Sequence, residues 1–204
     1  MSPAALLLPE QLHALALAFG EETAYQLVAG PSLTLAQWDA DASRLARGLM
    51  AEGVEAGDRV AIHLEPANAL RWIVTYSAVH RAGAVAVPFN PQLTRPEVAR
   101  MLDHSGAAAS ITQESLVPRY ADRRPALVVT VPRADTDYDP VDGHPPVDAT
   151  GVRPWEEMLA HDAEYLQVPR APDDLAEILY TSGTTGQPKA VAGRHHNSSM
   201  VPFV

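Results

Sequence analysis

Cysteine is absent from the 204-residue sequence, which excludes disulfide bonds, thiol nucleophiles and thiolate metal ligands within this chain. Long apolar runs are also missing, because no stretch approaches the roughly 18 consecutive apolar residues that a membrane-spanning helix needs. The apolar patch near the N-terminus has no basic residue before it, and Pro9, Glu10 and His13 interrupt it, which argues against a secretory signal. We therefore expect a cytoplasmic protein without a membrane span.

Positive charge is scarce: 15 Lys and Arg residues stand against 25 Asp and Glu residues, for a formal net charge of −10. A surface of this sign repels nucleic acids and acidic membranes at long range, so we expect no nucleic-acid partner. An acidic surface can still bind an anionic small molecule, because a few backbone amides and one lysine make a local positive pocket. Apolar residues make up 47% of the chain, enough for a substantial buried core.

Helices are predicted where apolar residues recur at helical spacing between residues that favour helix ends. The first begins after Thr34, and Gly53 is placed to end it. Asn68 is expected to cap the second. The third begins at Thr94–Glu97, which has the spacing of a capping box, in which two side chains satisfy backbone amides at the helix start. A short fourth helix is predicted over residues 155–161.

Strands are predicted between and after these helices, at residues 58–64, 84–88, 107–112, 126–131 and 175–180. Alternating strands and helices indicate an α/β protein with a mostly parallel sheet flanked by helices. The stretch from Pro132 to Pro154 is rich in Pro, Asp and Gly and predicts an exposed loop. We treat residues 1–204 as one α/β unit; a division into two domains at this loop is the alternative.

The most informative stretch is ILYTSGTTGQPKAV, Ile178–Val191. Glycines permit tight turns and close backbone approach, and successive amides in such a turn form an anion-binding concavity. Hydroxyl groups and a lysine ammonium add donors for phosphate oxygens. The sequence therefore predicts a polyphosphate-binding loop after a strand. Its candidate ligand-binding residues are Thr181, Ser182, Gly183, Thr184, Thr185, Gly186 and the lone Lys189.

The spacing differs from that of the common P-loop, which has four residues between its glycines and then Gly-Lys-Ser/Thr. Here only Thr184 and Thr185 separate Gly183 from Gly186, and Gln187-Pro188 precedes the lysine. A bare Ser/Thr/Gly turn after a strand is usually only a flexible connection. The upstream strand and the downstream lysine make the full string much more specific.

The string closely resembles the signature YTSGTTGxPKG of the adenylate-forming superfamily, which comprises acyl- and aryl-CoA synthetases, luciferases and the adenylation domains of peptide synthetases. The segment Ala82–Ala107, AGAVAVPFNPQLTRPEVARMLDHSGA, is similar to a second family segment, and the likeness runs from about Phe19 to Asn197. The resemblance implies the N-terminal part of the large domain of these enzymes, with an incomplete, mostly parallel sheet.

The resemblance also implies roles for the loop. Thr181–Gly186 and Lys189 would hold the β- and γ-phosphates of ATP, Lys189 would be the catalytic residue, and Thr181 would meet Mg²⁺. The reaction of the family joins a carboxylate to ATP as an acyl-adenylate and then transfers the acyl group to a thiol, usually that of CoA. We therefore expect a small-molecule carboxylate and ATP as partners, with CoA as co-substrate.

Two positions depart from the family pattern. Ala190 stands where the family usually has Gly, and a Cβ there costs about 1 kcal/mol or more if the position needs positive φ. Arg194 stands where the family usually has Thr, and it adds a cation near the expected phosphates that either helps binding or points into solvent. In the adjacent pair His195-His196, which rarely chelates one ion together, we expect a structural role for His195 and exposure for His196.

In the family, further nucleotide-binding and catalytic residues lie downstream of the loop, and none of their motifs occurs before Val204. We therefore expect an N-terminal portion that does not complete the reaction alone and needs a complementary downstream chain. One alternative is a phosphate-binding fragment without turnover. Another is part of an amino-acid adenylation domain that loads a carrier protein, and a third is an inert fragment.

Overall fold

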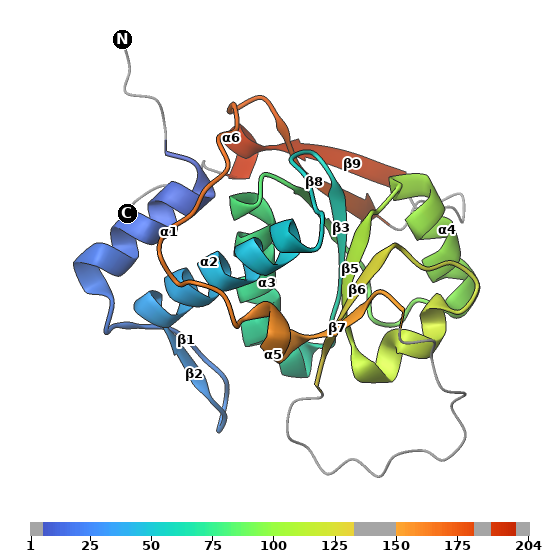
Figure 1. Cartoon of the computed structure of the whole chain (residues 1–204), viewed down its shortest axis with the longest axis horizontal. Helices are drawn as coiled ribbons and strands as arrows, with labels where there is room; N and C mark the ends of the chain where they lie inside the picture. Colours follow the sequence, from blue (N-terminus) through green and yellow to red (C-terminus); the bar gives the residue numbers. More distant parts are fainter. Residues whose placement is uncertain (1–5, 133–149, 182–188, 199–204) are drawn as a thin grey trace.

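The computed structural model of the protein describes residues 6–132, 150–181 and 189–198. Its centre is a seven-stranded sheet with the strand order β7-β6-β5-β3-β4-β8-β9 (Figure 1). Every neighbouring pair in this sheet is parallel except β8 and β9, which confirms the predicted mostly parallel α/β architecture. The strands are β3 Arg59–His63, β4 Val85–Pro88, β5 Ala109–Gln113, β6 Leu127–Val131, β7 Val152–Pro154, β8 Leu175–Thr181 and β9 Lys189–Arg194.

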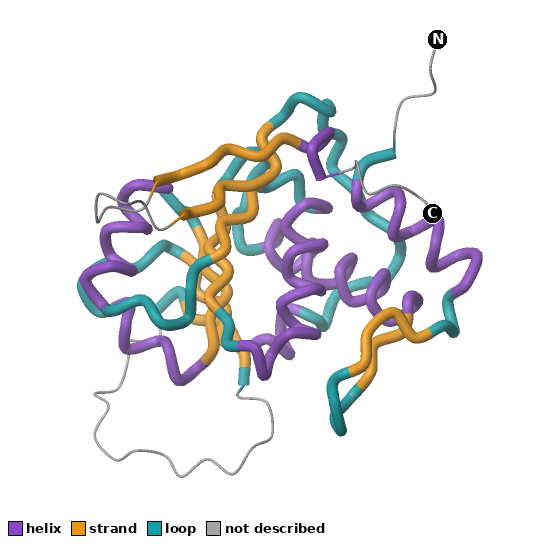
Figure 2. Tube along the Cα trace, turned by 180° about the vertical axis from the view of Figure 1, so that it is seen from behind, coloured by secondary structure: helices purple, strands orange, loops and turns teal. Residues whose placement is uncertain are grey.

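Helices cover both faces of the sheet (Figures 1 and 2). Side chains alternate along β3, so that Val60 and Ile62 join the core on one face while Ala61 joins the core on the other. The first face carries α2 Leu35–Ala51, α3 Ala69–Arg81 and α5 Trp155–Met158, and the second carries α4 Arg95–Ser105 and the 3₁₀ helix η2 Glu114–Tyr120. The connection from β3 to β4 therefore lies on the first face, and the connections from β4 to β5 and from β5 to β6 lie on the second.

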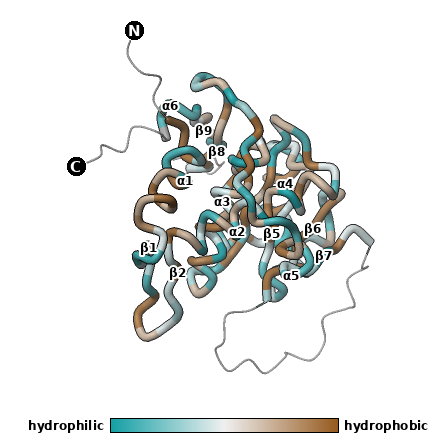
Figure 3. The backbone as a smooth tube through the Cα atoms, turned by 60° about the vertical axis from the view of Figure 1, so that its left-hand side comes forward, coloured by the Kyte–Doolittle hydropathy of each residue, from teal (hydrophilic) through white to brown (hydrophobic). Residues whose placement is uncertain are grey.

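The N-terminal segment lies outside this layered core. Helix α1, Leu8–Phe19, packs on α2, and a two-stranded antiparallel hairpin of β1, Thr23–Gln26, and β2, Ser32–Thr34, follows it. The hairpin extends away from the sheet, and Figure 3 shows hydrophobic residues at its outer end. Val28 there is fully exposed. Within the described residues, no helix combines the length and apolar character that crossing a membrane requires.

The predicted helices and strands of the core are confirmed to within a few residues at their ends. Gly53 and Gly106 follow α2 and α4 with φ of 91° and 62°, a left-handed conformation that glycine adopts without strain. The described elements that were not predicted are α1, the β1–β2 hairpin, the 3₁₀ helices η1 Pro66–Asn68 and η2, β7, β9 and the short helix α6 His195–Ser198. Strand β7 has only three residues, and β9 is largely exposed, so neither carries a strong apolar pattern.

The predicted side-chain cap at Asn68 is wrong. Asn68 precedes α3, but its side chain makes no capping hydrogen bond. Its Nδ2 donates instead to Gln113 Oε1 at 2.8 Å, and its Oδ1 accepts from Arg71 at 2.8 Å. The chain enters α3 through a 3₁₀ turn, η1 Pro66–Asn68. The side-chain amide of Asn68 is therefore occupied by a contact between the turn that follows β3 and the last residue of β5.

A buried charge joins the N-terminal helices to the core. Arg81 on α3 is fully buried and forms an ion pair with the carboxylate of Asp39 on α2. The Arg81 guanidinium also donates a hydrogen bond to the backbone carbonyl of Asp39 at 2.8 Å. The guanidinium carbon lies 5.0 Å from the ring centre of Tyr165, a cation–π contact. His13 of α1 stacks on Tyr165 and contacts the Asp39 carboxylate at 2.9 Å. These contacts fix α1, α2 and α3 against one another.

Asp39→Asn removes the counter-ion and leaves the Arg81 cation buried, so we expect the free energy of unfolding to fall by about 3 kcal/mol. The matched variant Asp41→Asn breaks an exposed pair with Arg44 on the same helix, with an expected loss below about 1 kcal/mol. Urea unfolding followed by circular dichroism measures both. Equal losses in the two variants would contradict a structural role for the buried pair.

Candidate functional site

The predicted phosphate loop is held at both ends by an antiparallel hairpin. Strands β8 and β9 pair from Leu175 opposite Arg194 to Thr181 opposite Lys189. The Thr181 hydroxyl donates to the Lys189 carbonyl at 3.5 Å. Five predicted phosphate-binding residues lie outside the described part of the chain, namely Ser182, Gly183, Thr184, Thr185 and Gly186. The structure thus brings the two ends of the predicted site together.

Thr181 and Lys189 have exposed side chains. Strand β8 runs parallel to β4, so Thr181, its last residue, lies at the edge of the sheet where the parallel strands end. Ligands of open α/β sheets bind outside that edge. A hydroxyl and an ammonium at this place suit an anionic ligand and its metal ion, while the Mg²⁺ role of Thr181 and the catalytic role of Lys189 stay predictions.

Helix α3 anchors the first half of β8 through polar contacts. His80 Nε2 donates to the carbonyl oxygen of Ala176 at 3.1 Å, and the Tyr76 hydroxyl donates to Glu177 Oε2 at 2.8 Å. The sheet itself holds β8 through a short ladder with β4, in which Ala86 pairs with Glu177. The polar contacts from α3 therefore help to set the position of the hairpin relative to the sheet.

Helix α4 anchors the other end of β8 from the opposite face. The Tyr180 hydroxyl lies 2.8 Å from His104 Nδ1, and the two rings meet edge to face at 5.6 Å. Ile178 and Tyr180 pack against the core on this side. Partial burial raises the pKa of Tyr180, which keeps its hydroxyl protonated and able to donate. The residue immediately before Thr181 is therefore fixed to a helix.

Gly193 is a feature of the hairpin that the sequence patterns did not predict. It stands opposite Glu177 in the ladder, and a Cβ at this position would lie 2.6 Å from Glu177 Cγ. Only glycine leaves room for the glutamate that Tyr76 holds. The signal in the sequence was an isolated glycine inside an otherwise strand-like stretch.

The two departures from the family pattern have structural outcomes. Ala190 lies within β9 and does not have positive φ, because Ala29 is the only non-glycine residue of the described ranges that does. The Cβ of alanine at position 190 therefore causes no backbone strain. Arg194 is at the far end of β9 from Lys189, about 17 Å away at the usual rise per residue. Its guanidinium donates to the Asp173 carbonyl. The expectation that it adds a cation near the phosphates is wrong.

His195 and His196 begin the short helix α6, His195–Ser198, after the hairpin. His195 is 1% exposed, its backbone amide donates to the Asp174 carbonyl at 3.1 Å, and its ring meets His80 edge to face at 5.5 Å. Burial lowers the pKa of His195. His196 is partly exposed. A structural role for His195 fits these contacts, and no described group of three or more His, Asp or Glu side chains is arranged to hold a metal ion.

A family model described as AMP-binding enzyme matches residues 13–201. The chain belongs to the AMP-binding enzyme family. It is 35% identical over 172 residues to feruloyl-CoA synthase from Amycolatopsis sp, covering 82% of this chain and 29% of that protein. It is 30% identical over 164 residues to a linear gramicidin synthase polypeptide from Brevibacillus parabrevis, covering 80% of this chain and 3% of that protein.

Among solved structures, the anthranilate CoA ligase AuaEII in complex with anthranoyl-AMP superposes with a TM-score of 0.79. The superposition covers 95% of this chain and 35% of that chain, and the two are 20% identical in sequence, a level that shows the shared fold alone. The chain thus spans about a third or less of the length of these relatives. Family membership rests on the family model and the curated relatives.

The buried histidines make stability depend on pH. Burial and, to a smaller extent, the neighbouring His195 lower the pKa of His80 to about 4. Burial and, to a smaller extent, the nearby Arg119 lower the pKa of His63 to about 4. Between these values and the ordinary 6.5, the unfolded chain binds protons at both positions and the folded chain does not. Stability is therefore full above about pH 6.5 and falls as the pH drops toward 4.

We expect the free energy of unfolding to fall by up to about 1.4 kcal/mol per pH unit for each of His63 and His80 as the pH drops below 6.5. His80→Gln retains a donor for the Ala176 carbonyl but cannot titrate, so the share of the slope that comes from His80 should disappear, while the shares of His63 and His195 remain. Urea unfolding at a series of pH values measures it, with the exposed His161→Gln as the control that leaves the slope unchanged. A full slope in His80→Gln would refute the assignment.

Proposed function

We propose that this chain binds ATP with Mg²⁺ at the end of the β8–β9 hairpin and contributes to the activation of a carboxylate for transfer to a thiol. The observation that carries the proposal is the pairing of Thr181 with Lys189, which holds both ends of a family phosphate signature at the ligand-binding edge of an α/β sheet. The hydroxyls and amides of that signature would hold the β- and γ-phosphates.

The reaction proposed for the whole enzyme has two steps. A carboxylate oxygen attacks the α-phosphorus of ATP, the bond to the bridging oxygen of the β-phosphate breaks, and pyrophosphate leaves. A thiol sulfur then attacks the acyl carbon, its proton is lost, and AMP leaves. The first step joins two anions, so charge neutralisation and positioning supply most of the rate enhancement.

Two side chains of this chain would serve that step. Lys189 is the only lysine in the sequence, and it would place an ammonium beside the phosphates as negative charge moves to the departing pyrophosphate. The Thr181 hydroxyl would help to hold Mg²⁺, which when bound neutralises phosphate charge. The exposed hydroxyl at the end of β8 fits this role.

The proposed substrate is a fatty or aryl carboxylate and the proposed acceptor is CoA; the aryl substrate and the CoA acceptor are in keeping with the name of the feruloyl-CoA synthase relative. A second candidate acceptor is the thiol of a carrier protein, favoured by the 30% identity to linear gramicidin synthase. Carboxylate-dependent release of pyrophosphate distinguishes either reaction from phosphate binding without turnover.

Lys189→Ala removes the proposed phosphate-binding ammonium, so we expect the Kd for ATP with Mg²⁺ to rise at least about tenfold, or ~1.4 kcal/mol. Isothermal titration calorimetry measures the change. Arg194→Ala is the matched control, because it removes a cation from the opposite end of the same strand and should alter the Kd less than about twofold. Equal weakening in both variants would point to a general charge effect and contradict the proposed site.

Because Lys189 is the sole lysine, covalent labelling offers an independent measurement. An acyl-phosphate ester of ATP transfers its acyl group to an amine beside the bound triphosphate. We expect mass spectrometry to find the label on Lys189 and excess ATP to suppress it. Labelling that ATP does not suppress would show that the lysine does not face the nucleotide.

A further inference from the structure

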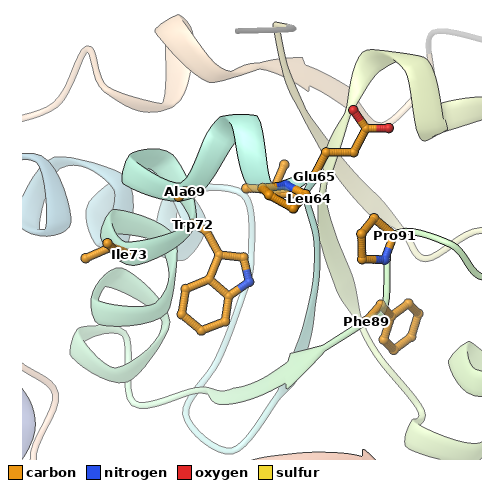
Figure 4. A pocket seen from close by; sticks show the side chains of 8 residues that line it. Leu64, Glu65, Ala69, Trp72, Ile73, Phe89 and Pro91 are labelled. Carbon is orange, nitrogen blue, oxygen red and sulfur yellow. The ribbon is translucent and has the colours of Figure 1, made fainter. Parts of the chain in front are cut away.

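An open pocket of about 250 Å³ lies beside the carboxyl ends of β3 and β4 (Figure 4). Neither Thr181 nor Lys189, the two described residues of the predicted phosphate site, lines it. Its described walls are apolar, and Glu65 is the one charged residue among the described lining residues. The apolar lining includes Leu64, Pro66, Trp72, Ile73, Phe89 and Pro91.

The pocket lies where the topology of the sheet leaves a crevice. The connection after β3 leads to α3 on one face, and the connection after the adjacent β4 leads to α4 on the other face. Loops that leave neighbouring parallel strands toward opposite faces separate at the strand ends, and ligands of open α/β sheets bind in the crevice so formed. Leu64 and Phe89, the residues just beyond these two strands, line the pocket from its two sides.

The pocket walls are held in place by contacts behind them. The Trp72 indole stacks on Tyr76 with ring centres 5.2 Å apart and an interplanar angle of 11°. The Tyr76 hydroxyl is in turn fixed by Glu177 at 2.8 Å. Phe89 is 4% exposed and meets the ring of His63 edge to face at 5.9 Å. A preformed aromatic wall of this kind binds a ring or short chain with little reorganisation.

Glu65 gives the pocket a negative rim. Its carboxylate lies at the upper edge of the view in Figure 4, and Oε2 accepts from Gln113 Nε2 at 2.9 Å. Two arginines lie near the pocket in space and keep their charge. Arg71 is turned toward Asn68, to whose side-chain oxygen it donates, and Arg119 is turned toward the backbone carbonyls of Pro91 and Leu93. Neither arginine lines the pocket. A carboxylate ligand would therefore meet like charge at this rim, whereas an ammonium would be attracted.

We propose that this pocket binds a small molecule with an apolar ring or short alkyl body and a protonated amine. The apolar part lies against Trp72 and Phe89, and the amine lies at the Glu65 carboxylate. The pocket is separate from the two described residues of the predicted phosphate site, because neither Thr181 nor Lys189 lines it. The proposal stands independently of ATP binding.

Three probes of similar shape and different charge test the proposal: phenethylamine, phenethyl alcohol and hydrocinnamate. None absorbs where tryptophan is excited, so the change in protein fluorescence that is lost in Trp72→Phe reports binding beside Trp72, and saturation-transfer NMR checks it. We expect phenethylamine to bind at least about tenfold tighter than hydrocinnamate, with the alcohol between them. In Glu65→Gln, which retains an acceptor for Gln113, this preference should fall below about threefold.

A filling variant locates the binding. Ala69 lines the pocket from the start of α3, and Ala69→Phe fills the space, so we expect phenethylamine binding to be lost. Ala67→Phe is the matched control at an exposed position of the adjacent turn and should leave binding unchanged. Circular dichroism confirms that both variants fold. Undetectable phenethylamine binding, equal binding of the three probes, or an unchanged preference in Glu65→Gln would each overturn the proposal.

Discussion

The position of the β8–β9 hairpin depends on hydrogen bonds made by the buried face of α3. His80 and Tyr76, one helical turn apart, reach the carbonyl of Ala176 and the carboxylate of Glu177. An unpaired backbone carbonyl or carboxylate in this place would be costly, so these contacts favour one placement of β8 over the alternatives. The position of Thr181, at the far end of the hairpin, therefore depends on these contacts.

The same helix links two regions of the molecule. Along one side of α3, Trp72 faces the pocket, Tyr76 stacks behind it, and His80 meets His195 beyond the hairpin. Tyr76 thus contacts both the pocket wall and β8. A chain of packed rings transmits displacement because protein interiors are close-packed. Gly193 belongs to this arrangement, since it leaves the space in which Glu177 receives Tyr76.

The sequence predicted the parts of the fold that local patterns encode. Helices α2 and α4 follow from apolar spacing with Thr34 and Gly106 at their ends, and buried strands such as β3 follow from continuous apolar runs. Strand β9 was beyond such reasoning because its residues are exposed and its pairing with β8 is a tertiary contact. The side chain of Asn68 was misassigned because its partner, Gln113, is distant in sequence.

For the site, the family signature named the candidate phosphate-binding residues, whose roles stay predictions, and the structure shows that the two described ends, Thr181 and Lys189, lie side by side. The sequence analysis expected Arg194 near the phosphates because it is only five residues from Lys189. In an extended strand, however, residues five positions apart lie at opposite ends of the hairpin. The contacts of His104 and Glu177 could not be read from the sequence, since each joins β8 to a helix far away in the chain.

Hydrogen–deuterium exchange in the presence of ATP with Mg²⁺, compared with AMP, tests the central claim most directly. If the hairpin end grips the β- and γ-phosphates, ATP slows amide exchange in peptides that contain Thr181 and Lys189, whereas AMP, which lacks those phosphates, does not. Equal protection by the two nucleotides, or protection confined to other parts of the chain, would contradict the account.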